Sequence, residues 1–324
     1  MADWNALADK VIEGNEASRE ELLAVLESTD DELLTVMQAA FKVRKHFHGR
    51  EVKVHVLQNA KSGLCPEDCK FCSQSVHFHS EIDRYKMQDV QTLVDGASKA
   101  FAMGAVTYCM VTSTRGPTNK EVEMVCEATR QIKEKFPLKI CASLGLLKEG
   151  QAARLKDAGV DRYNHNIESS ERHFASVAST HKWEDRVNTV KEAKSVGMEA
   201  CCGGIMGMGE VHEDRVDMAI ALREIGVESV PVNFLDPRPG TPLEEVERIA
   251  PADALRALAM FRLANPEADV RVAGGREVTL GAMQPLALWA ANSFFTDGYL
   301  TTPGAAPSDD WLMIEQAGFV PSVH

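Results

Sequence analysis

The chain has 324 residues, enough for two small domains or one large α/β barrel. Its 35 basic and 48 acidic residues give a net charge of −13, which argues against binding to nucleic acid or an anionic membrane. No apolar run approaches the roughly 20 residues that span a bilayer, and the acidic N-terminus does not resemble a signal peptide. We therefore expect a cytoplasmic protein whose eight cysteines are thiols or metal ligands.

The predicted elements alternate along the chain after an N-terminal helical region in residues 1–48, where apolar residues recur at helical spacing. The predicted strands cover residues 51–60, 105–113, 138–145, 161–168, 198–207, 229–236, 269–275 and 292–298. The predicted helices between them cover residues 90–104, 119–136, 148–159, 183–197, 212–226, 251–266 and 281–291.

Strands that alternate with helices at this spacing indicate parallel β-α units. Eight such strands predict an α/β fold, a closed (β/α)8 TIM-type barrel with an N-terminal helical extension. An open, doubly wound sheet is the alternative. We expect a single domain over residues 1–324, with helices in 1–50, the barrel in 51–304 and a helix or tail in 305–324. Reactive groups of a barrel gather in its mouth, at the C-terminal ends of the strands.

Four residues on the predicted strands are unusual for a packed interior. Cys109, Cys141 and Cys201 lie on the second, third and fifth strands, and Arg271 lies on the seventh. One residue from each tilted strand can point to a common interior position. A buried cysteine alone can be a small hydrophobe, but an interior arginine needs an anionic partner. A cluster that contains thiolates and sulfides would be such a partner.

Three nearby residues have structural explanations. Cys126 lies inside a predicted helix and is expected to fill the core. Cys202 follows Cys201 directly, so it should face the opposite side of the strand. His165 lies between two asparagines and should also point away from their side.

The loop after the first strand, "NAKSGLCPEDCKFCSQS", contains Cys65, Cys69 and Cys72 in the spacing C-x3-C-x2-C. Three thiolates suit zinc or an iron–sulfur cluster. Zinc would need a fourth ligand, for which His77 and His79 are close enough in sequence. A 4Fe–4S cluster on three cysteines instead leaves one iron open to a small molecule.

This loop, placed after the first strand of a β/α barrel, resembles the signature of the radical S-adenosylmethionine (SAM) superfamily. The resemblance implies that SAM chelates the open iron of the 4Fe–4S cluster through its amino and carboxylate groups. Cleavage of SAM then yields a 5′-deoxyadenosyl radical. Phe71 matches an aromatic position that packs near the adenine in that superfamily.

Further motifs, from about residue 5 to the end, resemble the biotin synthase family. They are "YNHN" at 163–166, "GGIMGMGE" at 203–210, "GTPLE" at 240–244, "GGRE" at 274–277 and "YLTTPG" at 299–304. The resemblance implies a sulfurtransferase that converts dethiobiotin to biotin, with two hydrogen abstractions and two SAM molecules. It also implies a 2Fe–2S cluster that donates the sulfur, with ligands at Cys109, Cys141, Cys201 and Arg271.

The resemblance also assigns binding residues. Its SAM-binding positions match Phe71, Asn166, Glu168, Gly203, Ile205, Gly207 and Glu210, and its dethiobiotin-binding positions match Asn164, Asn166, Asn233, Thr301 and Thr302. We expect Asn164, Asn166 and Glu168 on one face of the fourth strand. Glu168 departs from the family, which often has aspartate or asparagine there. Plain turns and strand ends are the alternative explanation for the glycine-rich stretch and for the threonines.

The family further implies a flavodoxin- or ferredoxin-type electron donor, iron–sulfur assembly proteins and a homodimer. Two other functions remain open. A methylornithine-type mutase or a hydrogenase-maturation enzyme would need the SAM cluster but not the interior 2Fe–2S cluster. A non-catalytic metalloprotein would hold zinc in the cysteine loop and would be colourless.

Overall fold

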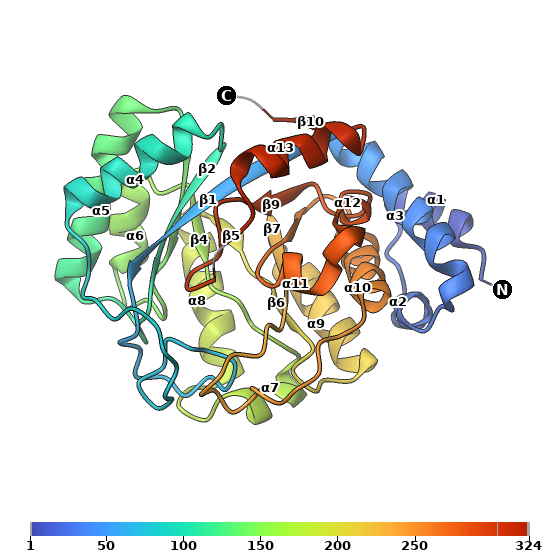
Figure 1. The fold of residues 1–324 in the computed structure, drawn as a ribbon, viewed down its shortest axis with the longest axis horizontal. Helices are drawn as coiled ribbons and strands as arrows, with labels where there is room; N and C mark the ends of the chain where they lie inside the picture. The colour runs from blue at the N-terminus through green and yellow to red at the C-terminus, as the bar shows by residue number, and fades with distance from the viewer. Residues whose placement is uncertain (1, 303, 323–324) are drawn as a thin grey trace.

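The computed structural model describes residues 2–302 and 304–322, so Pro303 of the "YLTTPG" motif lies outside the described residues. The strands are β1 (Glu51–Lys61), β2 (Thr107–Thr112), β3 (Lys139–Ser143), β4 (Arg162–Asn164), β5 (Glu199–Cys201), β6 (Gly204–Met206), β7 (Ser229–Phe234), β8 (Asp269–Val272), β9 (Ser293–Phe295) and β10 (Val320–Pro321). Parallel pairing runs from β1 through β2, β3, β4, β5, β7, β8 and β9 and returns to β1 (Figure 1). The sheet is therefore the closed (β/α)8 barrel that the sequence predicts, and the open sheet is excluded.

Helices surround the barrel and extend it at the N-terminal side (Figure 1). They are α1 (Trp4–Ile12), α2 (Arg19–Leu26), α3 (Leu33–His48), α4 (Val90–Ala102), α5 (Asn119–Lys135), α6 (Gln151–Asp157), α7 (Glu171–Val177), α8 (Trp183–Ser195), α9 (His212–Ile225), α10 (Pro251–Ala264), α11 (Arg276–Leu280), α12 (Gln284–Ala287) and α13 (Pro307–Gln316), with the 3-10 turns η1 (Asp30–Glu32) and η2 (Gly281–Met283). Side-chain caps define several starts. Asp89 accepts a hydrogen bond from the backbone of Thr92 at the start of α4, and Thr118 and Glu121 form a capping box at the start of α5.

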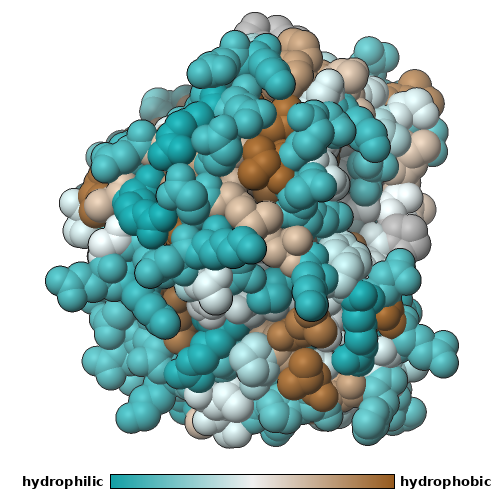
Figure 2. Space-filling model, turned by 90° about the vertical axis from the view of Figure 1, so that its left-hand side faces the viewer, coloured by the Kyte–Doolittle hydropathy of each residue, from teal (hydrophilic) through white to brown (hydrophobic). Residues whose placement is uncertain are grey.

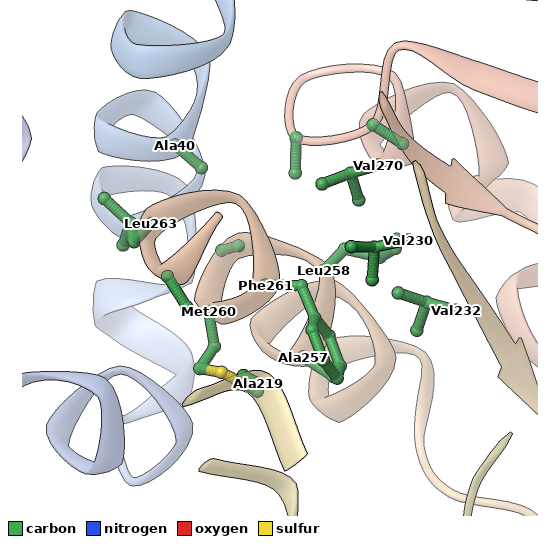
Figure 3. Packing of buried hydrophobic residues seen from close by; sticks show 14 of the residues in the cluster. Ala40, Ala219, Val230, Val232, Ala257, Leu258, Met260, Phe261, Leu263 and Val270 are labelled. Carbon is green, nitrogen blue, oxygen red and sulfur yellow. The ribbon is translucent and has the colours of Figure 1, made fainter. Parts of the chain in front are cut away.

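Helix α10 joins the N-terminal helices to the barrel. Residues 254–264 of this helix are all buried, which is typical of a helix that is enclosed on every side. Figure 3 shows α10 between Ala40 of α3 and the barrel residues Val230, Val232 and Val270. The extension is therefore packed against the barrel through a continuous hydrophobic core.

The structure differs from the predicted elements where glycines and short turns interrupt the pattern. The predicted strand 198–207 is two strands, β5 and β6, and the predicted strand 161–168 ends at Asn164 as β4. The predicted helix 281–291 is replaced by η2 and α12, which follow α11. Helix α7 and strand β10 have no counterpart in the predicted elements.

The break between β5 and β6 has a steric cause. A Cβ atom at Gly203 would lie 1.9 Å from the carbonyl oxygen of Pro231 on β7, so only glycine allows this close approach. Beyond the break, Gly204 pairs with Val232 of β7, and β6 continues the same side of the barrel.

The outer surface on the side of α4, α5 and α6 is mainly hydrophilic, and its hydrophobic residues form small, separate patches (Figure 2). No helix within the described residues is long and apolar enough to cross a membrane.

Candidate active site

The barrel mouth leads into a cavity of about 280 Å³. The predicted site residues in its wall are Phe71, Cys72, Cys109, Cys141, Asn164, Asn166, Glu168, Cys201, Ile205, Asn233, Arg271, Thr301 and Thr302. Cys65, Cys69, Gly203, Gly207 and Glu210 lie outside this wall in the described structure. The fold thus brings the cysteine loop, the interior thiols and the polar residues of β4 to one space.

Three interior thiols meet at the base of the cavity. The β2–β3 register pairs Cys109 with Cys141, and the Cys141 thiol shares hydrogen bonds with those of Cys109 and Cys201. The contact with Cys109 and burial raise the pKa of Cys141, and the contact with Cys141 and burial raise the pKa of Cys201 well above its ordinary value. The thiols of Cys141 and Cys201 are therefore protonated until a cation replaces their protons, as a bound metal does.

Arg271 completes this group from β8. Its Nη1 atom donates to the sulfur of Cys201 at 3.5 Å, and its Nη2 atom donates to the hydroxyl of Ser229 at 3.0 Å. Arg271 is 1% exposed, and among the described residues its Nε atom has no partner and no carboxylate forms an ion pair with it. Three soft sulfur donors beside a cation that lacks an anion fit an iron–sulfur cluster of net negative charge.

The cysteine loop forms the other side of the site. Burial raises the pKa of Cys69 to about 12 and that of Cys72 to about 11, and it also raises the pKa of Cys65. Within the described residues, no three His, Cys, Asp or Glu side chains converge on a point that could hold a single metal ion, as zinc requires. His77, a candidate fourth zinc ligand, is exposed and contacts the carbonyl of Pro66 at 2.9 Å.

The segment between α7 and α8 anchors this loop. The Asp68 carboxylate accepts hydrogen bonds from the backbone of Ser179 at 2.9 Å and of Thr180 at 3.1 Å. The backbone N–H of Lys70 donates to the carbonyl of Val177 at 3.0 Å. These contacts hold the cysteines before any metal binds, and the sequence pattern gave no signal for them.

Arg186 on α8 is a site residue that sequence reasoning missed. Its guanidinium lines the cavity, donates to the sulfur of Cys69 at 3.6 Å and forms an ion pair with Glu168 at 3.2 Å. Its Nε atom donates to Nε2 of His181 at 2.8 Å, and Nδ1 of His181 donates to Glu67 of the cysteine loop at 2.5 Å. Arg186 lies in a helix with several charged residues, so no sequence pattern distinguishes it from surface residues.

Polar residues at the end of β4 and just beyond it form a hydrogen-bonded row. Asn164 donates to Asn166 at 3.4 Å, and Asn166 donates to Glu168 at 3.4 Å, so the three side chains share a side although β4 ends at Asn164. Burial raises the pKa of Glu168 despite its ion pair with Arg186. The backbone of Glu168 has a φ of 66°, which is rare for a non-glycine residue and is typical of functional sites.

The backbone is irregular beyond β4, and the predicted direction of the His165 side chain is wrong. His165 contributes to the cavity wall rather than facing away from it, because the strand alternation stops at Asn164. Cys202 and Cys126 do pack into hydrophobic cores, as predicted.

The glycine-rich stretch is largely explained by the turn it forms. Glu210 accepts hydrogen bonds from the backbone of Gly207 and Met208, each at 2.7 Å, and Gly207 has a φ of 97°. Ile205 alone among its predicted residues contacts the described cavity. Asn233 also lines the cavity, but its amide is held by the backbone of Gly204 at 3.1 Å and of Gly274 at 2.9 Å.

The two threonines close the far side of the cavity. The hydroxyl of Thr301 lies 3.1 Å from that of Ser73, next to the cysteine loop. Thr302 accepts a hydrogen bond from Arg238 at 2.5 Å. Residues far apart in sequence therefore meet above the interior thiols.

Comparisons with known proteins agree with this geometry. Residues 61–223 match the model of the Radical SAM superfamily, and residues 231–320 match that of the Biotin and Thiamin Synthesis associated domain. The chain is 62% identical over 323 residues to the biotin synthase of Salinibacter ruber, covering 100% of this chain and 90% of that protein. It is 50% identical over 319 residues to the biotin synthase of Bacillus licheniformis, covering 98% and 96%.

Solved structures share the fold at lower identity. Methylornithine synthase has a TM-score of 0.85 at 20% identity, covering 98% of this chain and 97% of its own. The FeFe-hydrogenase maturase HydG of Carboxydothermus hydrogenoformans has a TM-score of 0.83 at 17% identity, covering 99% and 79%. These two likenesses concern the fold alone, whereas the matches over nearly the whole chain at 50% and 62% identity define the family. The chain belongs to the biotin synthase family of the radical SAM superfamily.

Proposed function

We propose that this enzyme converts dethiobiotin to biotin by inserting sulfur between two unactivated carbons. The observation that carries the proposal is the group of three buried thiols with Arg271 at the base of the cavity that the cysteine loop borders. A second sulfur-rich group at the base of the same cavity is where a sulfur donor for this insertion would lie. The family of this chain and its two matched domains support the same reaction.

The two cysteine groups divide the cofactors between them. Cys65, Cys69 and Cys72 would hold a 4Fe–4S cluster, whose open iron would take SAM. Cys109, Cys141, Cys201 and Arg271 would hold a 2Fe–2S cluster. When bound, the first cluster supplies the electron that cleaves SAM, and the second supplies the sulfur.

The chain's own residues would bind and orient the reactants. Arg186, beside Cys69, is placed to pair with the carboxylate of SAM at the open iron. Phe71 and Ile205 offer apolar surface to the adenine, and Asn166 and Glu168 offer hydrogen bonds to the ribose. The role of Gly203, Gly207 and Glu210 would be indirect, since they shape the turn that carries Ile205.

The substrate would lie between SAM and the interior thiols. Asn164, Asn233, Thr301 and Thr302 line this part of the cavity and offer amide and hydroxyl groups to the ureido ring and carboxylate of dethiobiotin. The barrel wall would exclude water and hold the reacting carbons in line, so that a reactive radical meets only its intended partner.

The proposed function also includes the domain organisation, the cellular location, the oligomeric state and the partner proteins. We place helices in residues 1–50, the barrel in 51–304 and a C-terminal helix and tail in 305–324 of a single domain. The enzyme would act in the cytoplasm as a homodimer. It would receive electrons from a flavodoxin- or ferredoxin-type protein and its clusters from iron–sulfur assembly proteins.

The test is an anaerobic reconstitution with iron and sulfide, followed by metal and sulfide counts and by incubation with SAM, dethiobiotin and a reductant. We expect both 4Fe–4S and 2Fe–2S absorption, together with biotin and 5′-deoxyadenosine. A protein that cleaves SAM but holds only one cluster and yields no biotin would point to another radical SAM reaction. A colourless protein with stoichiometric zinc would contradict radical chemistry altogether.

A further inference from the structure

His55 on β1 is a buried side chain that the proposed function leaves without a role. It is 1% exposed, and neither of its ring nitrogens has a hydrogen-bond partner among residues 2–302 and 304–322. Val54 and Val56 pack in the hydrophobic clusters that include the surrounding helices. By strand alternation His55 therefore points into the barrel, as does Leu57, which lines the cavity. An unpaired buried imidazole indicates a missing partner.

The neighbours of His55 belong to the interior thiol site. The β1–β9 register pairs His55 with Phe295, and the two rings meet edge to face with centroids 5.8 Å apart. The guanidinium carbon of Arg271 lies 5.0 Å from the centroid of the same Phe295 ring. Leu57, two residues along β1, pairs with Cys109. His55 thus lies at the N-terminal side of the thiols and close to Arg271.

Packing alone does not explain a histidine at this position. An apolar ring would make the same edge-to-face contact with Phe295 and would leave no nitrogen unpaired. Burial, followed by the charges of Arg271 and Arg162, holds the pKa of His55 well below its ordinary value. The imidazole is therefore neutral and carries one N–H donor and one lone pair.

Two arginines beside the thiols also keep an unpaired nitrogen. In the described part of the chain, Arg271 has no partner at Nε and Arg162 has none at Nη1, although both residues are almost fully buried. The β3–β4 register pairs Arg162 with Cys141. Native proteins leave few buried polar atoms unpaired, so unpaired nitrogens on β1, β4 and β8 around three thiols indicate an anionic group between them.

We propose that His55 is a positioning residue for the interior 2Fe–2S cluster, to whose sulfur atoms its N–H donates a hydrogen bond. This role rests on the proposed function and adds to it. Arg271 fills a coordination position, whereas His55 acts on the cluster without binding iron. A hydrogen bond to sulfur stabilises the reduced, more negative state, so it raises the reduction potential of the cluster.

The experiment compares His55→Phe with the wild-type enzyme, each reconstituted with both clusters. Phenylalanine keeps an aromatic ring at position 55 but has no N–H group to donate a hydrogen bond. We expect unchanged iron and sulfide content and a more negative midpoint potential of the interior cluster. In the wild type, assembly in D2O should shift the iron–sulfur stretching bands. In His55→Phe, we expect this shift to be lost. His46→Phe is the control, since His46 is exposed on α3, away from the barrel interior, and the potential and D2O shift of this variant should equal those of the wild type.

A second pair of variants tests the same role if His55→Phe does not assemble the interior cluster. Glutamine and methionine have similar length and flexibility, but only glutamine donates a hydrogen bond. His55→Gln should keep a higher potential than His55→Met. Equal potentials in both comparisons, with intact clusters, would overturn the role of His55 and leave the proposed function untouched. Absence of the interior cluster from the wild-type enzyme would instead overturn the proposed function.

Discussion

At the scale of single residues, the four interior ligands proposed for the 2Fe–2S cluster are not equivalent. The Cys141 thiol contacts those of Cys109 and Cys201, whereas Arg271 contacts the thiols through Cys201 and is also held by Ser229. Its guanidinium contains no sulfur, so it cannot be the source of the transferred atom. Arg271 would fill a coordination position of the cluster and balance its negative charge, and neighbouring groups can contribute to both roles.

We therefore expect Arg271→Met to assemble a 2Fe–2S cluster and to form some biotin, whereas Cys141→Ala forms none. The measurement is the single-turnover biotin yield of both proteins after reconstitution with iron and sulfide. Arg271→Cys should also hold a cluster, with a changed spectrum. Equal, complete loss of biotin in Arg271→Met and Cys141→Ala would show that the arginine is as essential as the thiols.

The cysteine loop allows a sharper result, because three thiolates are the minimum for a cubane with one open iron. Cys65→Ala, Cys69→Ala and Cys72→Ala should each abolish SAM cleavage, which is measured as 5′-deoxyadenosine formed under strong reductant. Cys126→Ala, a core cysteine outside the site, is the control and should retain cleavage. Formation of 5′-deoxyadenosine by any of the three loop variants would refute the assignment of this cluster.

His181 offers a test of how Arg186 is held. His181→Ala removes the acceptor of the Arg186 Nε atom and the donor to Glu67. A buried group left unpaired costs about 1–3 kcal/mol, so SAM should bind about ten- to one-hundredfold more weakly. Equilibrium dialysis of SAM against the reconstituted protein measures this effect, with His173→Ala on α7 as the control. Unchanged SAM affinity in His181→Ala would mean that Arg186 needs no such support.

Some of these site residues can be predicted from the sequence, and others cannot. Cysteine spacing and the placement of thiols on predicted strands identify Cys65 and Cys141 because sulfur is rare and its spacing is specific. Arg186 and His181 escape it because an arginine on a charged helix and a histidine in a turn look like surface residues. Their burial depends on how α8 packs over the cysteine loop, which local sequence does not encode.

At the scale of elements, the segment that forms β5 and β6 departs most from a regular barrel strand. The chain breaks between β5 and β6 because Gly203 approaches the carbonyl of Pro231. This break lets β6 continue the barrel and places Ile205 in the cavity wall. A hydrophobic run with glycines predicts a strand but does not reveal that the strand is interrupted, because the cause lies on β7.

Gly203→Ala should therefore destabilise the fold by about 1–3 kcal/mol, the usual cost of overpacking against backbone. Thermal unfolding of the metal-free protein measures it. A Gly203→Ala protein as stable as the wild type would show that β7 can move away.

At the scale of the whole molecule, the barrel brings two sulfur-rich groups to opposite sides of one cavity. Alternating strands and helices predict this barrel well, since each β-α unit is encoded locally. The short helix α11 and the pairing of β10 with β1 were not predicted, because contacts between distant parts of the chain decide them. The cavity wall likewise depends on the closed barrel, which places Thr301 beside Ser73.

The central claim is that the sulfur of biotin comes from the interior thiol site. The most direct test is a single turnover of enzyme whose clusters were assembled with isotopically heavy sulfide, followed by mass spectrometry of the biotin formed from dethiobiotin and SAM. We predict heavy sulfur in the wild-type product and no biotin from Cys141→Ala, whose 4Fe–4S absorption persists. Light sulfur in the wild-type biotin, or biotin from Cys141→Ala, would contradict the account.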